Sequence, residues 1–253
     1  MKKKFLLFTL FMLLACGVYT APAYADISLF DWTVNIDGVV SEISLGDPIP
    51  SGMDIGLFDD LTGLGTIEVT VSGPGDHFVG LFVDHELSEA TNTFFNETGS
   101  ASGALAAGQT WEIDEPGFDV DDPGDPDDDY LGNPGDIYWN LLDSYDLDVV
   151  SFLDNGIGED YWDPSNPRTF PNDVSMAIGW EFTVDAGFPV IVGFELSDTV
   201  VPGGFYLTQY DPDSDEHVYF SSDLTVVPVP GAVLLGAIGL SFTGWRLRRR
   251  RTS

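Results

Sequence analysis

Hydrophobic and polar residues alternate along several short segments in the middle of the chain. The clearest segment is 66–72, in which Ile67, Val69 and Val71 alternate with polar residues. Because successive side chains of a strand point to opposite faces, this spacing predicts a strand with one buried face. Residues 77–83 are expected to form a strand that returns after the Gly-Pro-Gly-Asp turn at 73–76, so that the two make a hairpin.

Five more segments carry the same strand signal, at 110–113, 174–184, 190–196, 205–210 and 218–226. Short strands between turns rich in Gly, Pro and Asp predict an all-β fold, a single antiparallel β-sandwich of the jelly-roll-like kind. Helices are expected only at 86–93 and 139–144. Residues 116–171 are expected to be a long, irregular, acidic insertion in a loop of the sandwich.

The first 25 residues have the three parts of a secretory signal peptide. A basic start at 2–4 precedes an apolar run from Phe5 to about Ala15, and Ala23-Tyr24-Ala25 provides an A-x-A site for signal peptidase. Residues 1–25 are therefore expected to direct export through the Sec machinery. The stretch 13–16 loosely resembles a lipobox, so lipidation at Cys16 is the alternative. Cys16 is the only cysteine, and the exported part is expected to have neither disulfides nor thiolate metal sites.

A second apolar segment lies near the end of the chain. Residues 231–245 contain no charge, and as an α-helix they would span about 22 Å. A bilayer core is about 30 Å thick. Trp245 suits the membrane interface, and the basic tail behind it obeys the positive-inside rule. The tail contains Arg246, Arg248, Arg249, Arg250 and Arg251. We expect a short transmembrane helix, which would be the chain's only part in the membrane.

The features of this end resemble the PEP-CTERM sorting signal. The motif Val227-Pro228-Val229-Pro230 is followed by a short apolar helix and a terminal arginine cluster, in the order found in that family. The resemblance covers about 27 residues and implies that an exosortase, a membrane-embedded peptidase, removes the segment 228–253. Val229 replaces the usual Glu of the family, which puts the exosortase subtype in question. The protein would then pass from a transient inner-membrane anchor to the cell surface or extracellular matrix. A plain anchor is the alternative.

Charge is distributed very unevenly. The 253 residues include 42 acidic and nine basic ones, for a formal net charge of −33. Residues 26–227, the expected exported domain, hold all 42 acids and only Arg168 as a base, which gives −41. Such a surface repels nucleic acid and attracts cations. The chain is nevertheless 43% apolar, which is hydrophobic enough to bury a core.

Two acidic arrays are candidate Ca²⁺ sites. Alternate side-chain oxygens on a tight loop are how proteins bind this hard cation. The first array follows an EF-hand-like frame and consists of Asp125, Asp127, Asp129, Asn133 and Asp136. Tyr130 stands where that frame needs Gly, and Asp136 replaces the usual Glu. The second, weaker array consists of Asp211, Asp213 and Asp215. The alternative for both is a solvated acidic loop, which high-salt adaptation would also favour.

Other chemistry has weaker support. The segment 84–89 resembles a zincin motif, but Glu89 stands where the second His is required, so a polar strand end is the better interpretation. Arg168 could clamp a carboxylate ligand or simply neutralise nearby acids. No Gly-x-Ser-x-Gly elbow is present, and no carboxylate pair is distinctive.

Together these features predict a non-enzymatic exported protein with a structural or adhesive role in biofilm or extracellular polysaccharide. The setting is what the family resemblance implies. One alternative is a Ca²⁺-dependent, lectin-like module that binds polysaccharide through aromatic residues of the insertion: Tyr138, Trp139, Tyr161 and Trp162. A second alternative is a secreted hydrolase, which would need convergent carboxylates of shifted pKa in a concave site.

Overall fold

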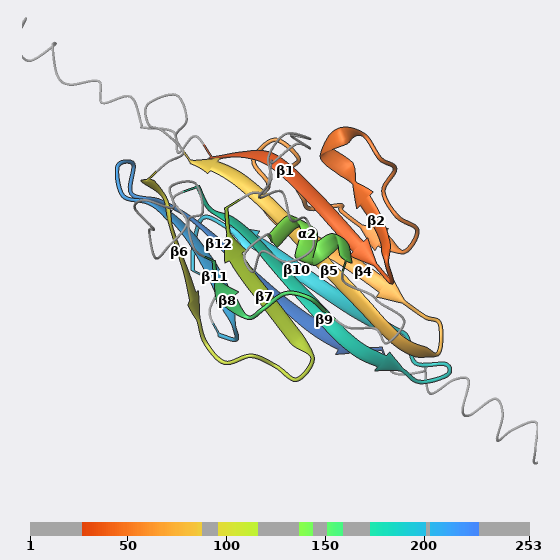
Figure 1. Ribbon diagram of the computed structural model, residues 1–253. Coiled ribbons are helices and arrows are strands. Elements are labelled where there is room, and N and C mark those ends of the chain that lie inside the picture. Colours follow the sequence, from red (N-terminus) through yellow and green to blue (C-terminus); the bar gives the residue numbers. More distant parts are fainter. Residues whose placement is uncertain are drawn as a thin grey trace, which may run out of the picture.

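The computed structural model describes residues 27–87, 96–115, 137–143, 151–158, 173–200 and 203–227. This part of the chain is almost entirely β and forms two six-stranded sheets that pack face to face (Figure 1). Every strand pair is antiparallel except the short parallel contact between β7 and β8. The predicted all-β class is therefore confirmed. No helix of the described residues has the length and apolar character needed to cross a membrane.

The first sheet has the order β2-β1-β5-β9-β7-β8. Its strands are β1 (Ile27–Ile36), β2 (Val39–Glu42), β5 (Gly75–Leu87), β7 (Gln109–Asp114), β8 (Gly156–Ile157) and β9 (Ser175–Val184). A short 3₁₀ turn, η1 (Ile43–Leu45), follows β2. The second sheet has the order β3-β4-β10-β12-β11-β6. Its strands are β3 (Met53–Asp54), β4 (Gly65–Val71), β6 (Thr98–Ser102), β10 (Val190–Ser197), β11 (Tyr206–Asp211) and β12 (Glu216–Val226).

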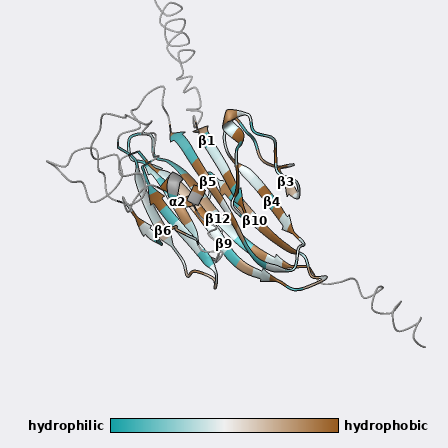
Figure 2. Ribbon diagram, turned by 45° about the vertical axis from the view of Figure 1, so that its right-hand side comes forward, coloured by the Kyte–Doolittle hydropathy of each residue, from teal (hydrophilic) through white to brown (hydrophobic). Residues whose placement is uncertain are grey.

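The main core lies between the two sheets. Strand β4 buries Ile67, Val69 and Val71 there and exposes the residues between them, as the alternation predicts. Phe194 of β10 and Phe220 of β12 join the same core with ring centroids 6.0 Å apart. Figure 2 shows the corresponding alternation of hydrophobic and hydrophilic segments along the strands.

The expected hairpin between 66–72 and 77–83 is wrong. Both segments are strands, but β4 pairs with β3 and β10, whereas β5 pairs with β1 and β9 in the other sheet. The Gly-Pro turn therefore carries the chain from one sheet to the other. Strand β5 is buried along both faces from Phe78 to His85, and the simple alternation of β4 gives no indication of this.

A short helix explains why the outer face of the first sheet is also buried. Helix α2 (Ile137–Asp143) packs Ile137 and Leu141 on Phe78 and Phe82 of β5. A β-carbon added to Gly80 would lie 2.5 Å from the Leu141 Cδ1 atom, so this glycine gives the helix room to approach the sheet. Helix α2 and strand β8 both fall within the segment 116–171 that was expected to be irregular, and α2 overlaps the expected helix at 139–144.

Candidate functional site

Buried and half-buried acidic residues gather at one end of the sandwich. Asp31, Asp84, Ser175 and Asp114 lie opposite one another on β1, β5, β9 and β7, so their side chains share the outer face of the first sheet. Asp173 precedes β9 and Glu97 precedes β6 at the same end. We call this set, Asp31, Asp84, Glu97, Asp114 and Asp173, the acidic end. The described residues contain no Lys or Arg, so histidine is the only basic side chain among them.

With Asp114, Asp84 is one of the two most buried members of the acidic end. Its side chain is 1% exposed, and neither carboxylate oxygen has a hydrogen-bond partner. Burial is the main cause that raises its pKa well above the ordinary value, and the charges of Asp173, Glu86 and Glu97 raise the pKa further. The direction of this shift follows from the site, because ionisation of Asp84 would leave a buried charge without a partner.

Glu97 joins the acidic end to the second sheet. Its Oε2 atom accepts hydrogen bonds from Gln209 Nε2 at 2.7 Å and from the Val174 amide at 3.1 Å. Burial raises the pKa of Glu97 to about 8, although these two hydrogen bonds lower it. Burial and the neighbouring Glu86 and Glu115 raise the pKa of Asp173 to about 7. Two carboxyl groups near their pKa at neutral pH form a proton-binding group, and such groups mark candidate functional sites.

The described histidines do not assemble a metal site. His85 is buried in β5 with a pKa of about 4, which burial lowers, and its ring contacts the Gly63 carbonyl at 3.3 Å. Because His85 lies on a strand, the helical spacing of a zincin motif is absent, and the segment that begins at Asp84 is the polar strand end expected as the better interpretation. His77 lies near the start of the same strand and His217 lies on β12, in the other sheet.

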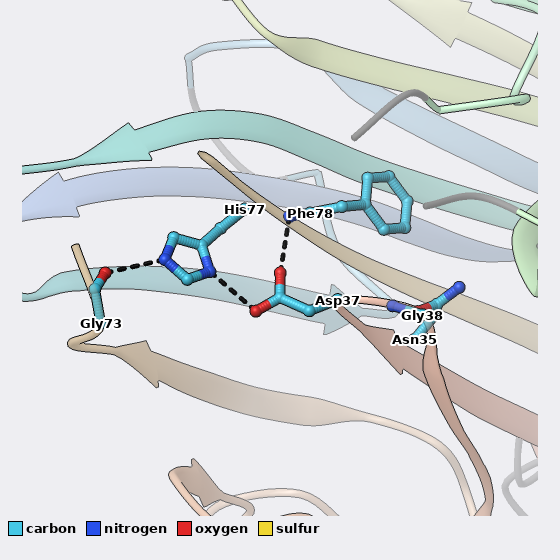
Figure 3. Close-up of polar contacts among 6 residues, drawn as sticks. All are labelled: Asn35, Asp37, Gly38, Gly73, His77 and Phe78. Atoms are coloured by element: carbon cyan, nitrogen blue, oxygen red, sulfur yellow. Dashed lines mark hydrogen bonds and ion pairs between the residues drawn. The ribbon is translucent and has the colours of Figure 1, made fainter. Parts of the chain in front are cut away.

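His77 has a structural role at the opposite end of β5. Its Nδ1 atom lies 2.7 Å from Asp37 Oδ2 and its Nε2 atom 2.7 Å from the Gly73 carbonyl oxygen (Figure 3). Since a carboxylate and a carbonyl both accept, both ring nitrogens donate when both bonds form. Asp37 also accepts from the Phe78 amide at 2.9 Å. The pair therefore fastens the β1–β2 turn to β5.

The weaker of the two expected Ca²⁺ arrays lies in the β11–β12 turn. Asp211 is fully buried and accepts hydrogen bonds from the amides of Asp213 at 2.9 Å and Ser214 at 3.1 Å, as in an Asx-type turn. Asp213 accepts from Asn96 Nδ2 at 2.8 Å, and Asp215 adopts a left-handed backbone with φ 62°. In the part of the chain that the structure describes, no three His, Cys, Asp or Glu side chains are placed to hold one metal ion. Calcium at this turn stays a prediction.

Several expected functional residues lie outside the described residues. They are the signal-peptidase residues Ala23 and Ala25, the motif residues Pro228, Val229 and Pro230, the five terminal arginines, the array from Asp125 to Asp136, Arg168, Tyr161 and Trp162. Val227 is described and directly follows β12. Tyr138 and Trp139 belong to α2.

The acidic end was not predicted from the sequence. The only available signal is that the charged pair Asp84 and Glu86 follows directly after the apolar run 78–83 of the same strand. That signal could have suggested buried carboxylates, but in a chain with 42 acidic residues it does not stand out.

The fold places the protein among all-β proteins built from two packed, mainly antiparallel sheets. Comparison with family models, with curated proteins and with solved structures found no match for the chain.

Proposed function

We propose that the protein is an exported, exosortase-sorted component of the cell surface or extracellular matrix, with a structural or adhesive role and no catalysis. The signal peptide 1–25 would engage the Sec machinery, and the segment 228–253 would hold the chain in the inner membrane until cleavage. The domain between them would be a jelly-roll-like sandwich. The repeated crossing of the chain between the two sheets, as from β4 to β5 and from β9 to β10, supports this topology.

The observation that carries the proposal is that the C-terminal tail and the acidic end lie at opposite ends of the sandwich. Val227 donates its amide to the Pro189 carbonyl at 2.8 Å, beside the β9–β10 turn, and the expected sorting signal begins at the next residue. Strands β9 and β12 both begin at the opposite end of the sandwich, and the acidic end lies there. Eleven residues of β12 at about 3.3 Å each span ~36 Å. A membrane anchor at the tail would thus leave the acidic end facing outward.

Processing of the tail tests the sorting part of the proposal. The double variant Pro228→Ala, Pro230→Ala, expressed in the native host, should accumulate in the membrane fraction at its unprocessed mass. Pro212→Ala, which changes a proline in the exposed β11–β12 turn, is the matched control and should be processed normally. Normal processing and release of the double variant would show that no exosortase reads this motif.

We further propose that Ca²⁺ orders the acidic array from Asp125 to Asp136. Bound Ca²⁺ stabilises the folded state by mass action, so EDTA should lower the thermal midpoint and added CaCl₂ should restore it. Asp127→Asn should weaken the response. An identical response of wild type and Asp127→Asn to Ca²⁺ would place the ion elsewhere.

A further inference from the structure

Four rings form a continuous row on the outer face of the second sheet. The centroids of Tyr210 and His217 are 4.4 Å apart, and those of His217 and Tyr219 are 5.7 Å apart with nearly parallel rings at 4°. Tyr206 meets Tyr219 edge-on at 6.0 Å. We call these four residues the aromatic row. It comes from neighbouring strands, β11 and β12, so the hairpin fixes its geometry.

The row belongs to the outer face because its neighbours in sequence point the other way. Leu207, Gln209, Val218 and Phe220 alternate with the four rings and are fully buried. The rings themselves are only partly buried. The core therefore does not enclose these rings, and they lie partly exposed along the outer side of the hairpin.

Hydroxyl and carboxylate side chains surround the row. The strand registers place Thr98, Ser100 and Ser102 of β6 beside β11. On the other side, Glu195 of β10 is exposed opposite Ser221, and Asp223 is exposed one step further along β12. Asp215 accepts a hydrogen bond from the Tyr210 hydroxyl at 3.4 Å. No described residue adds a lysine or arginine to this surface, so its formal charge is negative.

We propose that the aromatic row is a binding surface for an extended polysaccharide that contains cationic amino sugars. The apolar C–H face of a pyranose ring stacks on aromatic faces, whose quadrupole is negative. An ammonium group on the sugar is attracted to the same faces and to the carboxylates beside them. Anionic polymers are repelled by a domain of formal charge −41. The inference rests on the adhesive role proposed above and names its ligand class.

The dimensions suit a short run of sugars. The row extends over three alternate positions of a strand, from the level of His217 to that of Tyr206, which is ~13 Å at about 3.3 Å per residue. A row of rings carried by two paired strands binds a preformed extended chain with little loss of side-chain freedom, because a tyrosine has few rotatable bonds.

Calorimetric titration of the full-length protein in detergent tests the proposal. Three probes are compared: a glucosamine hexamer, an N-acetylglucosamine hexamer and cellohexaose. The glucosamine hexamer should bind most tightly. Tyr219→Leu keeps an apolar side chain but removes the ring that links Tyr206 to His217, and it should raise Kd about tenfold, or ~1.4 kcal/mol. Circular dichroism melts verify that the variant is folded.

Two control variants separate stacking from general charge attraction. Phe188→Ala removes an exposed ring in the β9–β10 turn, and Asp185→Asn removes a carboxylate there. Both should bind like wild type, whereas Glu195→Gln should weaken binding of the cationic probe alone. Equal affinity of Tyr219→Leu and wild type would overturn the proposal, as would no binding or equal binding of all three probes. Tail processing is measured independently in cells, so a failure of sorting leaves the binding result interpretable.

Discussion

Replacing Glu97 by Gln should make the protein less sensitive to alkaline pH. The Glu97 side chain is 2% exposed, and burial raises its pKa from the ordinary 4.5 to about 8. In the unfolded chain the carboxyl group ionises near 4.5. Between these pH values the folded state therefore holds a proton that the unfolded state has lost. Stability consequently falls as pH rises through this interval, because the unfolded state binds fewer protons.

The raised pKa of Glu97 sets the size of the loss in the free energy of unfolding. One pKa unit corresponds to about 1.36 kcal/mol, so the change from 4.5 to about 8 lowers the free energy of unfolding by ~5 kcal/mol over this range. Gln resembles the protonated acid and has no proton to lose. Relative to wild type, Glu97→Gln should therefore gain several kcal/mol between pH 5.5 and pH 8.5.

Urea denaturation at these two pH values measures the difference. The matched control is Glu68→Gln, because Glu68 is exposed on β4 and its replacement should leave the pH dependence unchanged. If Glu97→Gln retains the same loss of stability between pH 5.5 and pH 8.5 as wild type, then Glu97 does not hold a proton in the folded state. The buried charge of an ionised Glu97 would then have to be stabilised by an interaction other than protonation.

Three further changes should have defined effects. Gly80→Ala should lower the free energy of unfolding by about 1–3 kcal/mol in urea denaturation, because the new methyl group would lie 2.5 Å from Leu141 Cδ1. Asp37→Ala removes the acceptor shared by His77 and the Phe78 amide and should cost about 1–3 kcal/mol in the same assay. Raising NaCl from 0.15 to 1 M should increase the thermal midpoint, because the Debye length falls from about 8 to 3 Å and screens repulsion among the acids.

Each of these outcomes has a control. Gly73→Ala should be nearly neutral, since its added carbon would meet His77 at 3.7 Å, an ordinary contact. Asp60→Ala removes an exposed carboxylate, which the structure leaves without a hydrogen bond, and should change little. A lower midpoint at 1 M NaCl would mean that attractive ion pairs outweigh the repulsion. Among the described residues the one ion pair is His77–Asp37.

The strands with one buried face were predictable, and those without a clear pattern were not. Strand β4 alternates because one face meets the core and the other meets water. Strand β6 has the sequence Thr-Gly-Ser-Ala-Ser, which carries no hydrophobic period and gives no signal. The pairing partner of β5 was missed for a physical reason: a turn of Gly and Pro permits a hairpin and a crossing between sheets equally. Helix α2 covers β5 from outside with apolar side chains that are distant in sequence, so the pattern of β5 alone does not show which face meets a partner.

The site was predictable only where local sequence determines the structure. The Asp-Pro-Asp-Ser-Asp stretch was expected to be a turn, and Asp211 does form one with the amides of the next residues. The acidic end depends on contacts between distant parts of the chain, such as Gln209 with Glu97, which are 112 residues apart. Burial by distant parts of the chain raises the pKa of Glu97, and this burial is not encoded in a short window of sequence.

The buried carboxyl of Glu97 and the exposed aromatic row act on opposite faces of one strand. Gln209 of β11 donates to Glu97 at 2.7 Å and to the His85 carbonyl at 2.6 Å, which ties β11 to the first sheet from inside. Tyr210, the next residue, carries the row outside. Ionisation of Glu97 would place a buried charge beneath this strand, and the hydrogen bonds from Gln209 and the Val174 amide would offset only part of its cost. The hydrogen bonds that hold β11 against the first sheet therefore lie directly beneath the strand that carries Tyr206 and Tyr210.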